Sequence, residues 1–321
     1  MLRIINIALG MHRFMVRRNL PAQANGVSNM TIKTKLFRYK RLAILILALP
    51  AIAAADNEGV RYYVSLGTSL SVGIQPDAQG ANRPTNEGYA DQLFDIIEPQ
   101  YRKIRLVKLG CPGETTTTMM AGGKCSYSKG SQLSEAVNFL HAHKDKVELI
   151  TIDMGVNDIL AAGCIVGTVV DFPCIFGALD EIAINLPVIL SALREAADPE
   201  TLIVGMNYYN TFLAFWLSGI DGQVLAMQSA GLANILNHSI LAPIYSGFGI
   251  PVADVASAFM TNNFTNMVEF PSPGSGFFVP VNVAVICNWT YMCVPPPVGP
   301  NIHATPDGYG VIAATFASEL P

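Results

Sequence analysis

Residues 62–70 read YYVSLGTSL, an apolar run followed by glycine, two hydroxyl residues and leucine. Strands of a parallel sheet are covered on both faces and are therefore nearly continuous apolar runs, and Tyr62–Leu66 fits that pattern. Ser69 comes directly after this predicted strand, where a helix could begin. A serine hydroxyl placed there can act as a nucleophile when a base takes its proton. A turn or cap role is the ordinary alternative for a single serine.

Four further apolar runs predict strands, and longer segments between them predict helices. The strands are expected at Ile104–Leu109, Leu149–Met154, Leu202–Met206 and Ile250–Ala253. The helices are expected at Tyr89–Ile97, Leu133–His143, Ala178–Ala197, Gly222–Leu241 and Gly308–Ser318. The Pro- and Gly-rich stretch Pro271–Pro300 is expected to form a long loop. This alternation predicts the α/β class, as a three-layer α/β/α sandwich with a mainly parallel five-stranded sheet.

The N-terminal segment 1–55 has the order of a secretory signal peptide. Basic residues between Lys33 and Arg41 precede the apolar run Leu42–Leu49, and small residues follow it. The run is shorter than the ~20 residues that cross a bilayer. We expect cleavage near Ala53–Ala55, a start at Met1 or Met30, and a secreted domain at 56–321 that meets a membrane only transiently, through its leader. Retention at the cell surface by an uncleaved leader is the alternative.

The charge of the expected mature chain is strongly negative. Residues 56–321 hold 11 of the 20 Lys and Arg residues and all 24 Asp and Glu residues, a formal charge of −13. Such a surface repels phosphate backbones, so nucleic acid is not an expected partner.

All six cysteines lie after the expected leader, which indicates three disulfides in an exported protein. The sequence alone leaves the pairing open. Proximity along the chain favours Cys111–Cys125, Cys164–Cys174 and Cys287–Cys293. A zinc site is the competing interpretation, but no Cys-x-x-Cys spacing occurs.

Five histidines are candidates for the base that a serine nucleophile needs. His12 lies in the N-terminal segment, and His238 lies inside a predicted helix, where a structural role is expected. His141 and His143 are two residues apart on a helix, so they do not face one another and are not expected to bind a metal. His303 lies in a loop just before the last predicted helix, and we expect it to be the base.

Attack on an ester carbonyl creates a negative oxygen, which needs hydrogen-bond donors aimed at it. Ser69 can offer its backbone N–H, Gly113 lies in a tight turn after the second strand, and Asn157 follows the third strand. A turn glycine and a capping asparagine are the ordinary alternatives. Ligands of such sheets bind beyond the carboxyl ends of the strands, and all three residues are expected there. Together they favour an oxyanion site.

The chain resembles the SGNH hydrolases, also called GDSL esterases and lipases, over most of residues 60–318. Four blocks carry the resemblance: Gly67–Ser71, Leu109–Thr115, Gly155–Asp158 and Ile302–Tyr309. The resemblance implies the flavodoxin-like SGNH fold. Similarity at Gly130–Leu133 and in the cysteine-bearing loops is typical of secreted bacterial members.

Carried over residue by residue, the resemblance implies Ser69 as nucleophile and His303 as base. The oxyanion hole would consist of the Ser69 and Gly113 backbone N–H groups and the Asn157 side-chain amide. Such a site requires no metal and no organic cofactor.

The chain departs from the family pattern at several positions. Thr68 stands where the family usually has Asp, and Ala304 replaces a proline after the histidine. Pro300 occupies the position, three residues before the base, that often holds an Asp. Asn301 or a backbone carbonyl is then the candidate to orient the ring. A neutral partner lacks the charge that stabilises imidazolium, so a slower enzyme is expected.

We therefore expect a secreted, monomeric serine esterase or lipase that hydrolyses acyl esters of small molecules or lipids through an acyl-enzyme intermediate. Thr211–Leu217 and Phe277–Val279 would suit a wall for a fatty acyl chain, or simple core packing. A carbohydrate acetylesterase is the first alternative, and a non-catalytic module that binds glycan or lipid is the second. An α/β-hydrolase is not favoured, because no Gly-x-Ser-x-Gly elbow occurs.

Overall fold

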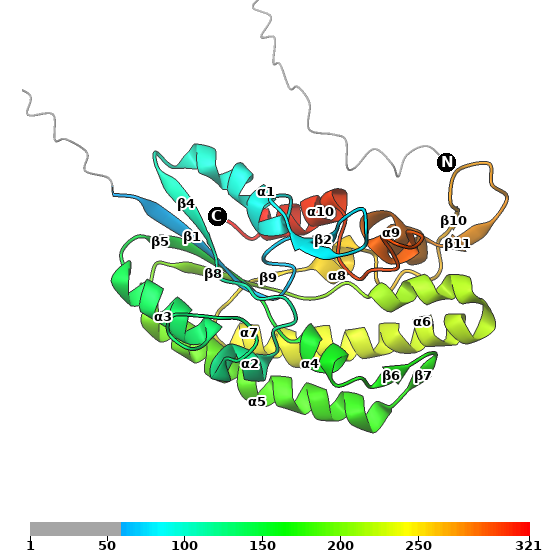
Figure 1. Cartoon of the computed structure of the whole chain (residues 1–321), viewed down its shortest axis with the longest axis horizontal. Coiled ribbons are helices and arrows are strands. Elements are labelled where there is room, and N and C mark those ends of the chain that lie inside the picture. The colour runs from blue at the N-terminus through cyan, green and yellow to red at the C-terminus, as the bar shows by residue number, and fades with distance from the viewer. Residues whose placement is uncertain (1–58) are drawn as a thin grey trace, which may run out of the picture. The chain divides into compact units, whose positions relative to one another are not determined.

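Five parallel strands form the central sheet of the computed structural model, which describes residues 59–321 (Figure 1). These strands are β1 (Arg61–Gly67), β4 (Ile104–Lys108), β5 (Val147–Asp153), β8 (Leu202–Met206) and β9 (Val252–Ala253). Their order across the sheet is β4-β1-β5-β8-β9, and every neighbouring pair is parallel. This is the 2-1-3-4-5 order of flavodoxin-like folds. The predicted five-stranded parallel sheet is confirmed.

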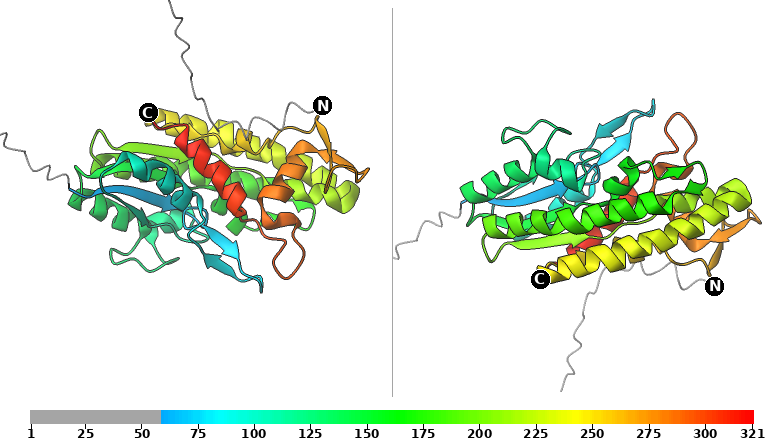
Figure 2. Two further views of the ribbon diagram at one scale, coloured as in Figure 1. Left: turned by 90° about the horizontal axis from the view of Figure 1, so that it is seen from above. Right: turned by 90° about the horizontal axis from the view of Figure 1, so that it is seen from below.

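Helices cover both faces of this sheet and form the two outer layers (Figures 1 and 2). One layer contains α1 (Tyr89–Ile97), α8 (Val255–Ala258), α9 (Val281–Trp289) and α10 (Pro306–Ala317). The other contains α2 (Thr116–Ala121), α3 (Gln132–Ala142), α4 (Val156–Ala161), α5 (Phe172–Ala196), α6 (Gly219–Asn234) and α7 (Ala242–Gly247). The predicted three-layer sandwich is therefore also confirmed.

Short elements fill the connections between the layers. Within residues 59–321 three antiparallel ribbons are present: β2 (Ile74–Pro76) with β3 (Asn82–Pro84), β6 (Ile165–Val166) with β7 (Val169–Val170), and β10 (Met267–Glu269) with β11 (Phe278–Pro280). Short 3-10 helices lie at η2 (Glu98–Gln100), η3 (Thr211–Ser218) and η5 (Tyr291–Cys293), and the π-helix η4 (Ile235–Leu241) continues α6. The first ribbon follows β1 closely and so shapes the turn that carries Ser69.

Helix α5 has the length and composition of a membrane span, with a mean hydropathy of 1.6 over a window that is 39% buried. Its buried side chains, such as Ile182 and Leu186, belong to the same core as Ile150 and Ile152 of β5. A helix that covers a parallel sheet needs an apolar face of this kind. Packing against the sheet therefore accounts for the buried part of its apolar surface.

Two expectations about local structure are wrong. Residues after Ser69 form a turn rather than a helix, because the Ile74 N–H donates to the Ser69 carbonyl at 3.0 Å as the chain reverses into β2. The stretch Pro271–Pro300 is not one loop, since it contains β11, α9 and η5. All its proline and glycine residues lie outside the apolar segment Val281–Trp289, which buries Val283 and Ile286. That segment is what forms the helix.

Three disulfides close short loops, in the pairing that proximity along the chain favoured: Cys111–Cys125, Cys164–Cys174 and Cys287–Cys293. No free cysteine remains in the part of the chain that the structure describes. The second disulfide joins the segment before β6 to the first turn of α5.

The expected leader, its cleavage near Ala53–Ala55 and the alternative starts at Met1 and Met30 lie outside the described residues. They stay predictions, as does the domain boundary at residue 55. The described residues belong to one compact unit.

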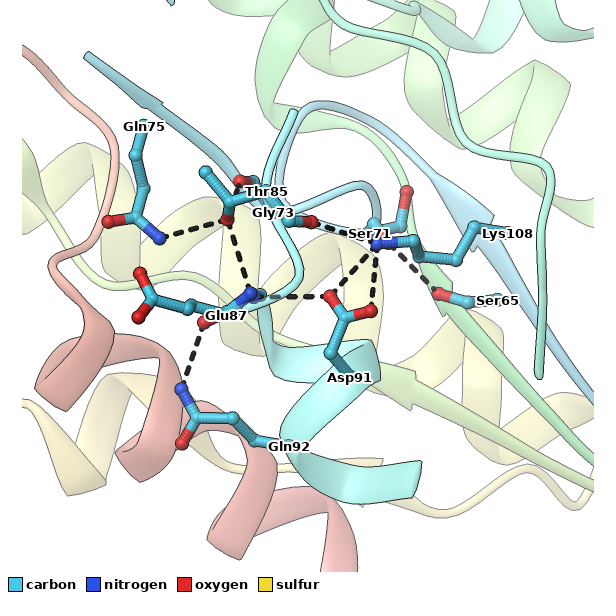
Figure 3. Close-up of polar contacts among 10 residues, drawn as sticks. Ser65, Ser71, Gly73, Gln75, Thr85, Glu87, Asp91, Gln92 and Lys108 are labelled. Atoms are coloured by element: carbon cyan, nitrogen blue, oxygen red, sulfur yellow. Dashed lines mark hydrogen bonds and ion pairs between the residues drawn. The ribbon is translucent and has the colours of Figure 1, made fainter. Parts of the chain in front are cut away.

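A polar cluster ties the first ribbon to α1 and β4 (Figure 3). Lys108 at the end of β4 donates to both carboxylate oxygens of Asp91 at 2.9 Å and to the Thr85 carbonyl at 3.0 Å. The Lys108 and Asp91 side chains are only 22% and 14% exposed. The Thr85 hydroxyl donates to the Gly73 carbonyl at 2.7 Å. The cluster therefore holds the far end of the serine turn in place.

We expect Lys108→Met to lower the free energy of unfolding by about 2–3 kcal/mol, because it leaves the largely buried Asp91 carboxylate without its cation. Urea denaturation monitored by circular dichroism measures the change. Adding Asp91→Asn to that variant should recover part of the loss. Arg83→Met is the matched control, since it removes an ion pair with Asp77 in which the arginine is 67% exposed, and should change little. Equal effects of the two single substitutions would contradict the role of burial.

Candidate active site

A pocket of about 100 Å³ lies at the carboxyl ends of the strands. Ser69 after β1, Asn157 after β5 and His303 before α10 all line it. β4 lies on one side of β1 and the other three strands on the opposite side, so this is the point where the strand order changes direction. Open α/β sheets bind ligands at such a point. Three of the four sequence-predicted site residues therefore meet in one cavity.

Most of the pocket wall is hydrocarbon. The apolar lining consists of Leu70, Val156, Ile159, Leu160, Ile165, Ile175, Phe212, Leu232, Ala233, Leu236 and Ile302. The segment Thr211–Leu217 contributes Thr211 and Phe212, as its apolar character led us to expect. The segment Phe277–Val279 does not line the pocket, and Val279 instead packs in a small separate core with Val283.

The serine turn is attached to the sheet through the buried carboxylate of Asp153 at the end of β5. One of its oxygens accepts from the Thr68 N–H at 2.8 Å and from the Thr68 hydroxyl at 2.5 Å. The other accepts from the Tyr89 hydroxyl at 2.8 Å. Thr68, which replaces the usual Asp of the family, thus donates to an acid from a neighbouring strand. Burial raises the pKa of Asp153 to about 7, and these donors oppose that rise.

Gly67 allows β1 and β5 to approach closely enough for Thr68 to donate its hydrogen bonds to Asp153. Its φ is +128°, and a Cβ at this position would lie 2.5 Å from the Asp153 carbonyl oxygen. Gln132 clamps the same peptide, because its Oε1 accepts from the Gly67 N–H at 2.7 Å and its Nε2 donates to the Gly67 carbonyl at 2.9 Å. The backbone just before Ser69 is therefore held by side chains from two other elements.

The Asn157 amide is positioned by the loop that follows β4. Its Nδ2 donates to the Glu114 carbonyl at 3.0 Å, which leaves the second amide proton for another acceptor. Gly113 is the residue before Glu114, with a φ of +76°, but it is not among the residues that line the pocket. Asn157 thus lines the pocket with one amide proton available, and its role as an oxyanion donor stays a prediction, as does that of Gly113.

Asn301 holds the His303 ring. Its Oδ1 accepts from the ring Nδ1 at 2.7 Å and from the His303 backbone N–H at 3.0 Å. Its Nδ2 donates to the Asn82 side chain at 2.8 Å, which orients the amide with its oxygen toward the ring. Because that oxygen only accepts, Nδ1 carries the proton and Nε2 is left with a free lone pair. Of the two orienting groups considered, the asparagine is the one bonded to Nδ1.

Burial of the His303 ring disfavours its protonated form. The side chain is 6% exposed, and desolvation lowers the pKa of His303 to about 4. A carboxylate in place of Asn301 would oppose this shift, but a neutral amide does not. The ring is therefore unprotonated near pH 7.

The histidine loop is fastened to the segment closed by Cys287–Cys293. The Tyr291 N–H donates to the His303 carbonyl at 3.0 Å, and the Asn301 N–H donates to the Tyr291 carbonyl at 3.0 Å. The Tyr209 hydroxyl donates to the Ile302 carbonyl at 3.2 Å from the pocket side. These bonds fix the backbone on both sides of the ring.

The other histidines of residues 59–321, His141, His143 and His238, do not line the pocket, and His143 packs its ring against Phe139 and Tyr62. Within residues 59–321 no group of three or more His, Cys, Asp or Glu side chains could hold a metal ion.

Sequence reasoning missed Asp153, Gln132 and Tyr89, which position the serine turn. An acidic residue that ends an apolar strand was the available signal for Asp153, because such a carboxyl must find donors when both faces of the sheet are covered. Gln132 lies in a block that resembles the family, but nothing in the sequence identified its partner.

Comparison with known proteins identifies relatives by fold alone. No family model matches the chain, and no curated protein matches its sequence. Two solved structures superpose with a TM-score of 0.53 each and are covered over 100% of their own chains. An extracellular lipase from Streptomyces rimosus is 18% identical and matches 81% of this chain. A phospholipase A1 from Streptomyces albidoflavus NA297 is 16% identical and matches 82%. Identities this low show a shared fold only. Any argument about the chemistry of this chain must therefore rest on the residues of its own site.

We expect Gly67→Ala to lower the free energy of unfolding by about 3 kcal/mol or more, because its Cβ would collide with Asp153 as well as strain the backbone. Gly123→Ala is the matched control. Gly123 also has a positive φ, +92°, but no atom of residues 59–321 lies within 4 Å of its added Cβ. Its cost should stay near 1–2 kcal/mol. Thermal denaturation of both variants measures the difference, and equal losses would exclude the steric cause.

We expect Asn301→Asp to raise the pKa of His303 by about 1–3, because a carboxylate beside Nδ1 stabilises the protonated ring. NMR titration of the ring resonances measures this, starting from a value of about 4 in the unsubstituted protein. Asn82→Ala, which removes the distal partner of Asn301 without adding charge, should leave the pKa nearly unchanged. An unaltered pKa in Asn301→Asp would show that Asn301 does not contact the ring in solution.

Proposed function

We propose that this chain is a serine esterase of the SGNH hydrolase type that acts on carboxylic esters with an apolar acyl chain. One observation carries the proposal: Ser69, Asn157 and His303 line a single apolar pocket, and the histidine there is neutral with Nε2 unoccupied. The shared fold with an extracellular lipase and a phospholipase A1 supports it.

In the first half-reaction Ser69 Oγ attacks the ester carbonyl carbon while His303 Nε2 takes its proton. The negative oxygen that forms accepts the free Asn157 amide proton, together with the backbone N–H of Ser69 and, as predicted, of Gly113. The C–O bond to the alcohol then breaks, and His303 returns the proton to the leaving oxygen. Ser69 remains acylated.

In the second half-reaction water attacks the acyl carbon, and His303 accepts a proton from that water. Collapse of the second tetrahedral intermediate releases the carboxylic acid and returns the proton to Ser69. Throughout both steps Asn301 keeps Nδ1 protonated and the ring in place. Because Asn301 is neutral, the imidazolium of each step receives less stabilisation than a triad acid would provide.

The pocket supports an acyl group longer than acetyl. A cavity of roughly 150 Å³ is enough to admit benzene, so the 100 Å³ beside Ser69 suits an aliphatic chain of several carbons. A carbohydrate acetylesterase would leave this hydrocarbon wall unfilled. That alternative therefore predicts no gain in rate as the acyl chain lengthens beyond acetyl.

A non-catalytic module remains the alternative from another class. Its basis is the absence of an acid beside His303. The free lone pair on Nε2 favours catalysis instead, because a general base must be unprotonated to accept a proton and this ring is neutral near pH 7. Its pKa of about 4 makes it a weaker base than an ordinary histidine, in line with the slower enzyme that we expect.

The proposed enzyme is exported from the cell. Its three disulfides support this, since such bonds persist in oxidising compartments. The leader expected at residues 1–55 would provide the route.

We expect hydrolysis of p-nitrophenyl esters to rise from acetate to butyrate or longer chains and to fall at least about a thousandfold in Ser69→Ala. Ser71→Ala, in the same turn, is the matched control and should retain catalysis. A fluorophosphonate probe should label the unsubstituted protein and not Ser69→Ala. Turnover that survives Ser69→Ala would eliminate the mechanism, and absence of both turnover and labelling would favour the binding module.

A further inference from the structure

Large apolar side chains are exposed on three elements at one end of the domain. In the ribbon β6–β7, Val166 is 74% and Val169 is 70% exposed, and the two are directly paired across the strands. On α6, Ile220, Val224 and Met227 are 79%, 42% and 51% exposed, and their spacing of four and three residues puts them on one side of the helix. Exposed apolar groups gathered in this way mark a contact surface.

The first turns of α5 and the ribbon β10–β11 extend this apolar set. Phe172 and Phe176, four residues apart on α5, are 40% and 46% exposed. Phe277 and Phe278 are each 54% exposed. We call the exposed apolar residues of β6–β7, α5, α6 and β10–β11 the apolar rim: Val166, Val169, Phe172, Phe176, Ile220, Val224, Met227, Phe277 and Phe278.

These elements lie at the same end of the domain as the carboxyl ends of the sheet strands. Figure 1 shows β6–β7, the start of α6 and β10–β11 together at the right, while β1 enters the sheet from the left. Both views in Figure 2 keep them at that end. The apolar rim and the pocket therefore share one end of the molecule.

The apolar rim is continuous with the pocket wall through a single ribbon. Successive strand residues point to opposite sides, so Ile165 lines the pocket while its neighbour Val166 faces solvent. The disulfide Cys164–Cys174 ties this ribbon to the first turn of α5, and the Asp171 N–H donates to the Cys164 carbonyl at 2.8 Å. The ribbon is thus held in place before any partner binds.

The charge of the residues near the apolar rim indicates whether it could bind an anionic or an uncharged lipid surface. From Val147 to Pro321 the only lysine or arginine is Arg194, which bonds to Thr201 at the far end of α5. Apart from Arg194, the charged residues on the rim elements are acidic: Asp180, Glu181 and Glu195 on α5, Asp221 on α6 and Glu269 on β10. A surface without cations has no electrostatic attraction for anionic lipids.

We propose that the apolar rim docks this protein onto a lipid surface without net charge, so that an acyl chain can pass from the lipid layer into the pocket. The second clause rests on the proposed esterase function, whereas the docking itself does not. Apolar side chains that enter the acyl boundary provide the binding free energy, and the acidic residues around them disfavour an anionic layer.

Vesicle flotation with the Ser69→Ala protein tests docking apart from hydrolysis. We expect it to float with phosphatidylcholine vesicles, to keep that binding at high salt, and to bind less to vesicles that contain phosphatidylglycerol. Replacing Val166, Val169 and Ile220 together with Glu should lower the partition coefficient at least about tenfold. The same three substitutions in the active protein should leave hydrolysis of a soluble ester unchanged, which verifies the fold.

Ile96→Glu is the matched control, because Ile96 is an exposed isoleucine, 45% accessible, near the end of α1 that leads into β4 at the opposite end of the sheet. It should bind vesicles like the parent. The proposal is overturned if the parent does not bind phosphatidylcholine, if the triple variant binds as well as the parent, or if binding needs anionic lipid and disappears in salt. It is also overturned if the parent protein is a dimer that does not bind vesicles and the three substitutions make it a monomer. A second copy of the chain would then be what covers the apolar rim. Loss of ester hydrolysis with intact flotation would instead count against the proposed function alone.

Discussion

The candidate site depends on one buried carboxylate, that of Asp153. It accepts the backbone and side-chain protons of Thr68 and the hydroxyl of Tyr89, and thereby fixes the turn that carries Ser69 to the neighbouring strand and to α1. A buried acid is costly unless donors surround it, so the strand end and the turn stabilise each other. Gly67 makes the approach possible, because any side chain there would occupy the space of Asp153.

The histidine that we propose as the base has a neutral hydrogen-bond partner instead of an acid. Asn301 holds the His303 ring by hydrogen bonding alone, and burial lowers the ring pKa to about 4. The ring is thereby available to take a proton over a wide pH range, but the imidazolium formed in a proposed reaction gains little from its surroundings. Compared with a histidine beside an acid, the orientation of this ring is kept, but the electrostatic stabilisation of its protonated form is lower.

The pocket and the apolar rim are formed by opposite sides of the same two segments, the ribbon β6–β7 and the start of α5. Ile165 and Ile175 face the cavity, whereas Val166 and Phe176 on the same elements face solvent. The disulfide Cys164–Cys174 makes one unit of them. The Lys and Arg residues of the described domain are also confined to one part of the chain, since all but Arg194 precede Val147, whereas acidic residues lie on both sides of that position. The lipid surface without net charge that we propose as a partner is consistent with both features.

The sequence by itself determined the sheet and the longer helices on both faces, because continuous apolar runs and helical spacing reflect local constraints. Close cysteine spacing favoured the disulfide pairing that the structure contains, but left other pairings open. It also indicated Ser69, Asn157 and His303 as candidates, since each follows or precedes a recognisable element; all three line one pocket, and their catalytic roles stay predictions. It missed the short helices α2, α4, α7 and α8 as well as α9, which lies among prolines, and it expected a helix after Ser69 where a turn forms. Only the tertiary structure decided that Asp153 and Gln132 hold the serine turn, that Asn301 faces His303, and that Gly113 stays off the pocket wall. Those outcomes depend on contacts between residues far apart in the chain, and no local pattern records which buried donor will meet which acceptor.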